Sequence, residues 1–171
     1  KGIPKKNIKN FLGKPLVQHS IDYAKDSKLV DQIILTTDSE EIKKVGLESN
    51  ISVIDRPSIL SNDEATTESA IEHVISLFKF NKDTIFILLQ PTSPLRPKNS
   101  LDLIINKFNK DACDSMLTLS PIHPLTWKIN KYKPECMYDY LNRPRRQDFK
   151  KEDIIYDENG CLIASTYEGI K

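Results

Sequence analysis

Short apolar runs that alternate with amphipathic stretches of helical period are the feature of this sequence that most restricts its fold. Residues 84–89 (Thr-Ile-Phe-Ile-Leu-Leu) predict a buried strand, and residues 32–37 predict another. Between them, four apolar residues recur at helical spacing and predict a helix over 67–78. Strands that alternate with helices indicate an α/β protein, here a Rossmann-like, mostly parallel sheet with helices on both faces.

Other segments extend this alternation. They are predicted helices at 15–25, after Ser39 and around 101–108, and predicted strands at 51–54 and 115–120. In sheets of this kind ligands bind beyond the carboxyl ends of the strands. The residues that directly follow strands are therefore the first candidates for a binding site, namely Asp38, Arg56 and residues 90–96.

The pattern changes over residues 122–158, where prolines, aromatic residues and a cluster of arginines replace the alternation. We interpret this stretch as an insertion into a core made of residues 1–121 and 159–171. Residues 157–160 (Asp-Glu-Asn-Gly) predict a turn that leads into a last strand. The chain opens on loop-like residues and ends soon after that strand, so we expect it to be a fragment of a larger protein.

Composition excludes several classes of function. The 171 residues carry 25 basic and 24 acidic side chains, so the net charge of +1 gives no basic face for nucleic acid. Apolar runs are too short to cross a membrane. Three widely spaced cysteines (Cys113, Cys136 and Cys161) fit neither a disulfide framework nor a zinc site. We expect a cytoplasmic protein that binds neither nucleic acid nor membranes.

Three segments carry groups suited to ligand binding. Lys1–Asn7 offers cations and backbone N–H groups to a triphosphate, although a solvated basic terminus would look the same. Gln90–Arg96 presents an amide, two hydroxyls and a guanidinium on a loop that its prolines make rigid. These groups suit a polyhydroxyl ligand, but a proline-rich turn whose hydroxyls bond the local backbone would have the same sequence. The arginines of 143–146 could bind a carboxylate, but a solvated surface patch or an interface would also explain them.

Acid–base and metal motifs are scarce. His19, His73 and His123 are isolated and suit packing or surface positions. Neither a Ser-His-Asp nor a Cys-His arrangement follows from the spacing. Asp38 and the Asp63-Glu64 pair are possible magnesium contacts, but helix capping explains them equally well.

In their order along the chain, these motifs resemble the acylneuraminate cytidylyltransferases, the CMP-sialic acid synthetase family that includes CMP-legionaminate and CMP-pseudaminate synthetases. The resemblance covers nearly the whole chain and implies a nucleotidyltransferase fold. It also implies transfer of CMP from CTP to a nonulosonic, sialic-acid-like sugar, with release of pyrophosphate. The matching segments are Lys1–Asn7, Gly13–Leu16, Thr36–Asp38, Arg56–Pro57, Ala65–Thr67, Gln90–Arg96, Pro144–Asp148 and Glu158–Gly160.

The resemblance implies a role for each matching polar residue. Lys6 and Asn7 would contact the phosphates and ribose of CTP, and Arg56 and Thr67 would hold the cytidine part. Lys6 and Gln90 are the residues for which we expect a catalytic role. The expected sugar-binding residues are Gln90, Thr92, Ser93, Lys128 and Arg145.

Three further expectations follow from the family. Mg²⁺ is expected as the cofactor, held by aspartates that would lie beyond residue 171, so no metal ligand is assigned in this chain. The segment 122–158 is expected to mediate homodimerisation and to reach the partner's site. Asp157-Glu158 stands where N-acetylneuraminate enzymes have an arginine, which favours a related sugar such as legionaminate or pseudaminate.

Our hypothesis for the reaction is in-line attack of the sugar's anomeric hydroxyl on the α-phosphorus of CTP. The protein would contribute positioning and neutralisation of phosphate charge. Other readings remain open: transfer of CMP to an eight-carbon acid sugar (3-deoxy-manno-octulosonate), transfer of another nucleotide to a neutral sugar, a non-catalytic nucleotide- or sugar-binding domain, and an RNA-binding domain.

Overall fold

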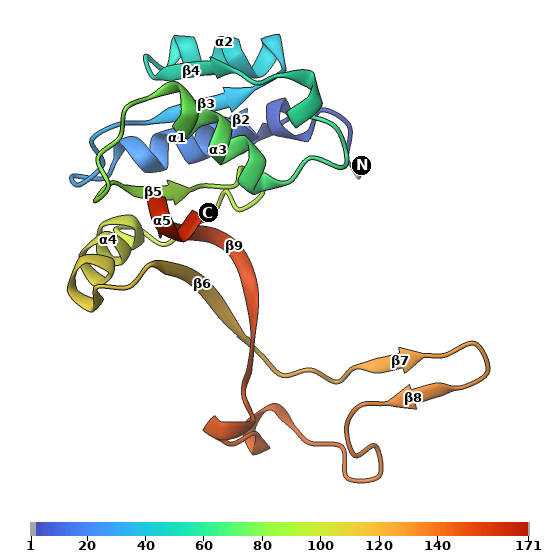
Figure 1. Ribbon diagram of the computed structural model, residues 1–171. Coiled ribbons are helices and arrows are strands. Elements are labelled where there is room, and N and C mark those ends of the chain that lie inside the picture. The colour runs from blue at the N-terminus through green and yellow to red at the C-terminus, as the bar shows by residue number, and fades with distance from the viewer. Residues whose placement is uncertain (1–2, 171) are drawn as a thin grey trace. The chain divides into compact units, whose positions relative to one another are not determined.

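The chain forms two units, and the computed structural model describes its residues 3–170 (Figure 1). Unit 1 comprises Lys1–Leu117 and Gly160–Lys171, and unit 2 comprises Thr118–Asn159. Unit 2 begins at Thr118, inside the strand Ser115–Ile122, rather than at residue 122 where the sequence pattern changes. Lys1 and Gly2, the start of the expected triphosphate loop, lie outside the described residues, as does Lys171.

Unit 1 alternates strands and helices, as the sequence predicts. In chain order its elements are the 3-10 helix η1 (Lys6–Ile8), β1 (Asn10–Phe11), β2 (Lys14–Pro15), α1 (Leu16–Lys25), β3 (Ile34–Thr37), α2 (Glu40–Glu48), β4 (Ser52–Asp55), η2 (Ser58–Leu60), α3 (Thr67–Leu77), β5 (Ile85–Leu88), α4 (Ser100–Asp111), β6 (Ser115–Ile122), β9 (Ile155–Thr166) and α5 (Tyr167–Ile170). β6 and β9 extend into unit 2.

Local chemistry explains where the helices begin. The Ser39 hydroxyl accepts a hydrogen bond from the backbone N–H of Ile42 at 3.4 Å, so it caps α2 as predicted. Thr66 caps α3 in the same way, because its Oγ1 accepts from the N–H of Ser69 at 3.1 Å. The cap of α3 is therefore Thr66, and Thr67 is the first helical residue.

Two sheets form unit 1 besides the small β1–β2 hairpin. β3 pairs with β4 in parallel, from Ile34 opposite Ser52 to Thr37 opposite Asp55. The second sheet has the order β5-β9-β6, and β9 runs antiparallel to β5. The β3, β4 and β5 arrows point to the same side of unit 1 in Figure 1, so the residues that follow these strands emerge at a common edge.

The hydrophobic core of unit 1 lies between α4 and the second sheet. Leu101, Ile104 and Ile105 of α4 form one buried cluster with Leu162 of β9. Burying four aliphatic side chains of this size stabilises the fold by roughly 1.5–3 kcal/mol each. The cluster fixes β9 beside the residues that follow β5.

The predicted turn at 157–160 is wrong. β9 runs through these residues as a single strand. The Asn-Gly pair does indicate a left-handed residue, since Gly160 has a φ of 61°, but this residue lies within the strand. Pairing of β9 with its neighbours outweighs the local preference of Asn-Gly for a turn.

Unit 2 contains a hairpin that the sequence did not reveal. β7 (Trp127–Ile129) pairs antiparallel with β8 (Pro134–Cys136), and two short 3-10 helices follow, η3 (Arg146–Asp148) and η4 (Lys151–Asp153). The side chain of Asn159 spans two residues of β6, accepting from Thr118 Oγ1 at 2.7 Å and donating to Ser120 Oγ at 3.0 Å.

Candidate active site

The N-terminal loop separates two neighbouring lysines. Lys5 takes a left-handed conformation, and its ammonium group pairs with both carboxylate oxygens of Glu41, at 3.0 and 2.9 Å. Lys6 is exposed and forms no ion pair with any of residues 3–170. No donor from residues 3–170 bonds the buried Asn7 Oδ1. Lys6 is thus available to an anion, and Asn7 offers an unsatisfied acceptor beside it.

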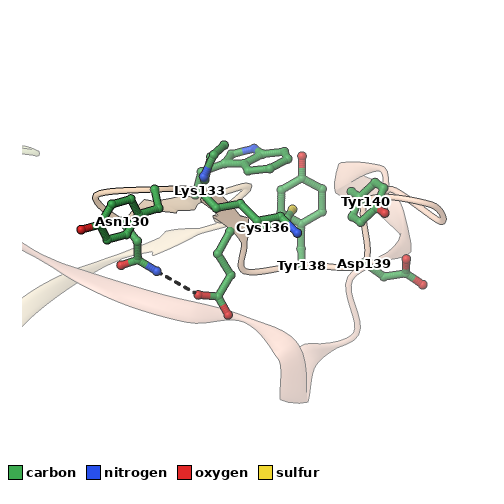
Figure 2. A pocket seen from close by; sticks show the side chains of 10 residues that line it. Asn130, Lys133, Cys136, Tyr138, Asp139 and Tyr140 are labelled. Carbon is green, nitrogen blue, oxygen red and sulfur yellow. Dashed lines mark hydrogen bonds between the residues drawn. The ribbon is translucent and has the colours of Figure 1, made fainter.

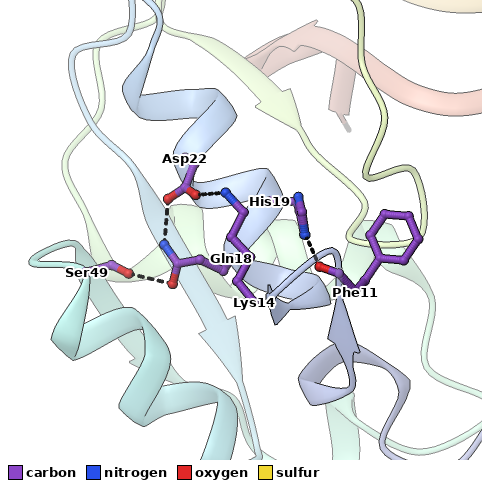
Figure 3. A network of polar contacts seen from close by, with 6 residues as sticks. All are labelled: Phe11, Lys14, Gln18, His19, Asp22 and Ser49. Atoms are coloured by element: carbon purple, nitrogen blue, oxygen red, sulfur yellow. Dashed lines mark hydrogen bonds and ion pairs between the residues drawn. The ribbon is translucent and has the colours of Figure 1, made fainter.

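The loop that carries Lys6 and Asn7 leads directly into the β1–β2 hairpin, and contacts between this hairpin and α1 hold it in place (Figure 3). His19 Nε2 lies 2.7 Å from the carbonyl oxygen of Phe11, and the two rings meet edge to face with centroids 5.3 Å apart. His19 is therefore a packing residue, as its isolation in the sequence indicates. The N–H of Leu16 donates to the carbonyl of Lys9 at 3.0 Å, which closes the loop onto the start of α1.

A second group of contacts in Figure 3 centres on Asp22 of α1. Its carboxylate accepts from Lys14 and, at 2.6 Å, from Gln18 Nε2. Gln18 Oε1 in turn accepts from Ser49 Oγ at 3.1 Å. Burial raises the pKa of Asp22, but the hydrogen bonds from Lys14 and Gln18 outweigh it and leave this pKa below its ordinary value. The network ties the hairpin, α1 and the end of α2 together.

Arg56 lies at the carboxyl ends of β3 and β4. Its backbone N–H donates to the carbonyl of Thr37 at 2.9 Å, and its Nε donates to Ser61 Oγ at 3.0 Å. Its Nη2 lies 3.8 Å from Asp38 Oδ1. The side chain is 26% exposed, so the guanidinium is oriented by protein contacts and still reaches solvent. Ser61 as an orienting group was not apparent from the sequence.

Gln90 follows β5, and its loop is fastened by Arg96. The guanidinium donates from Nη2 to the Gln90 carbonyl at 2.6 Å, from Nε to the Cys161 carbonyl at 2.8 Å and from Nη1 to Ser20 Oγ at 3.1 Å. Burial lowers the pKa of Arg96. The expectation that this loop presents a guanidinium to ligands is wrong, because the donors of Arg96 are already used within the protein.

The structure therefore groups the predicted nucleotide and sugar residues of unit 1 in two places. Lys6 and Asn7 adjoin the first turn of α2 through the Lys5–Glu41 pair, and Arg56 adjoins Asp38 just before the cap of that helix. Gln90 and Ser93 lie together against Gly160. Two consecutive residues of α1 connect these two groups of residues. His19 hydrogen-bonds the hairpin that follows Lys6 and Asn7, and Ser20 accepts from Arg96, which binds the Gln90 carbonyl.

Two other predicted residues of unit 1 stand apart. Thr67 is exposed in the first turn of α3, and Thr92 is exposed in the loop after β5. In the described part of the chain, neither side chain forms a hydrogen bond with the other predicted residues. Their roles remain predictions.

The two predicted residues of unit 2 are on separate segments. Lys128 is exposed on β7, where it pairs in register with Glu135. Arg145 precedes η3 and holds Asp148 with two hydrogen bonds, Nε to Oδ2 at 2.9 Å and Nη2 to Oδ1 at 3.0 Å. Hydrogen bonds from Arg145 hold the pKa of Asp148 below its ordinary value. A sugar carboxylate at Arg145 would have to compete with Asp148, a partner that sequence reasoning missed.

The hairpin of unit 2 also lines a hollow of 720 Å³ (Figure 2). Its aromatic wall includes Trp127 and Tyr138, whose rings meet edge to face with centroids 6.2 Å apart. Asn130 donates to Glu135 across the hairpin at 3.5 Å, and Tyr140 is 63% exposed at the rim. This face of unit 2 thus carries large apolar surface in contact with solvent.

Residues 3–170 contain no group of three or more His, Cys, Asp or Glu side chains that could hold a metal ion. Asp38 instead faces Arg56. The described residues alone do not fit a magnesium site, and we derive no reaction step through the metal. Nor does any helix in this part of the chain have the length and apolarity needed to cross a bilayer.

A family model described as Cytidylyltransferase matches residues 1–159. The chain belongs to this family. Among characterised cytidylyltransferases, it is 33% identical over 174 residues to the N-acylneuraminate cytidylyltransferase of Streptococcus agalactiae serotype III (strain NEM316). That match covers 98% of this chain and 41% of the relative, so the chain spans less than half of that protein's length.

Two shorter cytidylyltransferase relatives are covered more fully. The CMP-N,N'-diacetyllegionaminic acid synthase of Legionella pneumophila is 31% identical over 183 residues, which cover 99% of this chain and 75% of the relative. The pseudaminic acid cytidylyltransferase of Campylobacter jejuni (strain 81-176) is 31% identical over 174 residues, covering 97% and 73%.

The fold of this cytidylyltransferase chain also matches a solved structure. CMP:2-keto-3-deoxy-manno-octonic acid synthetase complexed with CTP aligns with a TM-score of 0.70 and 17% identity, over 98% of this chain and 70% of that one. At this identity the likeness concerns the fold alone, and it confirms the predicted α/β nucleotidyltransferase architecture.

Proposed function

We propose that this chain provides nucleotide- and sugar-binding residues of an enzyme that transfers CMP from CTP to a nonulosonic acid and releases pyrophosphate. The observation that carries the proposal is the placement of these residues in unit 1. Lys6 and Asn7 lie beside the Lys5–Glu41 pair at the first turn of α2, and Arg56 and Gln90 follow the parallel-pointing strands β4 and β5. Relatives at 31–33% identity are named for CMP transfer to nonulosonic acids, which supports this substrate class.

The proposed chemistry is one in-line substitution at phosphorus. The anomeric hydroxyl of the sugar acid forms a bond to the α-phosphorus, the bond from this phosphorus to the bridging oxygen breaks, and pyrophosphate leaves. The hydroxyl proton passes to solvent or to a basic group in the site. The protein contributes positioning and charge neutralisation rather than a covalent intermediate.

Each residue has a role suited to its surroundings. Lys6, which forms no ion pair with any of residues 3–170, neutralises triphosphate charge, and Asn7 contacts the ribose. Arg56, oriented by Ser61 and Asp38, contacts the cytidine part together with Thr67. We also propose that Gln90, Thr92 and Ser93, together with Lys128 and Arg145, bind the sugar acid.

Three properties of the whole enzyme complete the proposal. We propose Mg²⁺ as the cofactor, without assigning any described residue to it. We propose a homodimer formed through unit 2, supported by the exposed apolar side chains of the hairpin. We also propose a cytoplasmic location, which agrees with the absence of disulfide bonds among the described cysteines.

A pyrophosphate-release assay of the full-length protein tests the proposal. With CTP and Mg²⁺, we expect turnover on legionaminate or pseudaminate to exceed turnover on N-acetylneuraminate, and we expect EDTA to abolish it. Turnover only on 3-deoxy-manno-octulosonate, or only with another nucleotide, would contradict the substrate class. CTP binding without turnover on any sugar acid would indicate a non-catalytic binding domain.

A further inference from the structure

Gly160 of β9 lies against the carboxamide of Gln90. Its φ of +61° is a left-handed conformation that L side chains rarely adopt. A Cβ built on Gly160 would lie 3.1 Å from Gln90 Oε1 and 3.8 Å from Gln90 Cδ. The first distance is tighter than nearly all real Cβ contacts, so any side chain at this position would press on the carboxamide.

The backbone of Gln90 is not free to retreat from such a side chain. Arg96 binds the Gln90 carbonyl and the carbonyl of Cys161, the residue after Gly160, with one guanidinium. It also binds Ser20 on α1. This arrangement fixes the main chain of Gln90 relative to β9, and pressure from a Cβ at residue 160 would therefore fall on the Gln90 side chain.

The Gln90 carboxamide is otherwise unengaged. Within residues 3–170 it forms no side-chain hydrogen bond, and beyond the immediate chain neighbours of Gly160 its oxygen is the heavy atom nearest to the Cβ position of Gly160. Its NH₂ group is therefore the end turned away from β9. An amide NH₂ donates hydrogen bonds, so it suits the carboxylate or hydroxyl oxygens of a ligand.

We infer that Gly160 is a positioning residue that acts through Gln90. The absence of a Cβ at Gly160 leaves the space that the Gln90 carboxamide occupies beside β9, and Arg96 fixes the main chain from which that carboxamide extends. In this position its NH₂ group can face an oxygen-rich ligand of the sugar-acid class. The identity of the ligand rests on the proposed function, whereas the orientation of Gln90 does not.

The orientation is tested without turnover, by the side-chain amide NMR signals of Gln90 in the full-length protein. These signals are assigned by their loss in Gln90→Glu. We expect Gly160→Ala to shift them and Gly13→Ala to leave them unchanged. Gly13 is the matched control, because its φ is +89° but no heavy atom lies within 4 Å of its Cβ position. If Gly160→Ala fails to fold, Gly160→Asn replaces it, because asparagine also adds a Cβ but tolerates a positive φ. Unmoved signals in folded Gly160 variants would overturn the inference.

Kinetics test the consequence. We expect Gly160→Ala to raise KM for the sugar acid about ten-fold, the scale of one charge-assisted hydrogen bond, with KM for CTP unchanged. In a Gln90→Ala background the same change should leave the sugar KM unaltered. Independent, additive effects would refute a role through Gln90. Absence of CMP transfer by the wild-type enzyme would refute the proposed function. The NMR result would still decide whether Gly160 controls the orientation of the Gln90 carboxamide.

Discussion

At the residue scale, neighbouring groups of the same chemical type differ in what they already contact. Lys5 is paired with Glu41, whereas Lys6 has no ion partner in the described part of the chain. Arg96 uses its donors on two carbonyls and a hydroxyl. A ligand gains most from groups that have not already exchanged water for protein partners. Availability, rather than residue type, therefore separates binding residues from supporting ones.

The two lysines make a matched test. We expect Lys6→Ala to lower kcat/KM for CMP transfer about 100-fold, the cost of one preorganised electrostatic partner. Lys5→Ala should cost much less, because Lys5 already neutralises a carboxylate. The measurement is pyrophosphate release by each full-length variant under identical conditions. Equal losses in the two variants, or unchanged turnover in Lys6→Ala, would remove Lys6 from the mechanism.

At the element scale, α1 is the part of the fold on which both halves of the candidate site depend. Its buried stripe of Val17, Ile21 and Ala24 fixes the helix in the core, and this stripe is evident in the sequence. Its polar face binds the hairpin through His19 and Asp22. These contacts span eight residues along the chain, so helical periodicity does not reveal them.

The lowered pKa of Asp22 leads to a pH-dependent prediction for α1. A carboxylate whose folded pKa is depressed stabilises the protein above its unfolded pKa of about 4, and this contribution disappears as pH falls through the folded pKa. Because the side chain is 39% exposed, we expect Asp22→Asn to lower the unfolding free energy at pH 7 by less than about 1 kcal/mol.

Denaturant titrations of the wild type and Asp22→Asn between pH 7 and pH 3 measure this difference. The two unfolding free energies should converge at the acid end. Asp26→Asn is the control, because Asp26 lies exposed at the end of the same helix and forms no side-chain hydrogen bond with any described residue. A difference that stays constant down to pH 3 would contradict the role of the ionised carboxylate.

The elements also show which sequence signals are dependable. Strong periodicity predicted α1, α3 and α4 nearly to their ends. The β7–β8 hairpin was missed, because its strands are three residues long and contain proline and charged residues instead of an alternating apolar pattern. The Asn-Gly turn was wrong, because β9, which lies between β5 and β6 in its sheet, stays extended through Gly160.

At the scale of the whole molecule, apolar side chains of unit 2 are exposed to an extent unusual for a surface that meets only water. Ile129 is 84% exposed, Tyr132 90% and Leu141 78%. Large exposed apolar side chains are typical of a protein–protein interface where they gather into one patch. The exposure is a property of the tertiary structure, so composition alone did not predict which residues would carry it.

We expect the full-length enzyme to sediment as a dimer at micromolar concentration, with Ile129→Asp shifting it toward monomer. Leu103→Asp is the control, because Leu103 is 67% exposed on α4 of unit 1 and should leave the dimer intact. Sedimentation velocity distinguishes the two species. A wild-type monomer, or equal effects of the two variants, would contradict dimerisation through unit 2.

The candidate site shows the same limit on what sequence can predict. The segments that carry Arg56 and Gln90 were recognisable because they follow predicted strands, and the segment that carries Lys6 was recognisable from its run of basic residues. Their supporting contacts were not, since Arg96 reaches 65 residues along the chain to Cys161 and 76 residues back to Ser20. Contacts at such separations depend on how the elements pack, which no local pattern encodes.

The chain leaves unit 1 along β6 and returns along β9, and these two strands are hydrogen-bonded neighbours. Because the inserted segment begins and ends on adjacent strands, a change in its length need not alter the strand pairing of that sheet. Evolution can therefore lengthen, shorten or recompose unit 2 while the α/β unit keeps its register. Sequence change among related chains is thus free to concentrate in this one unit.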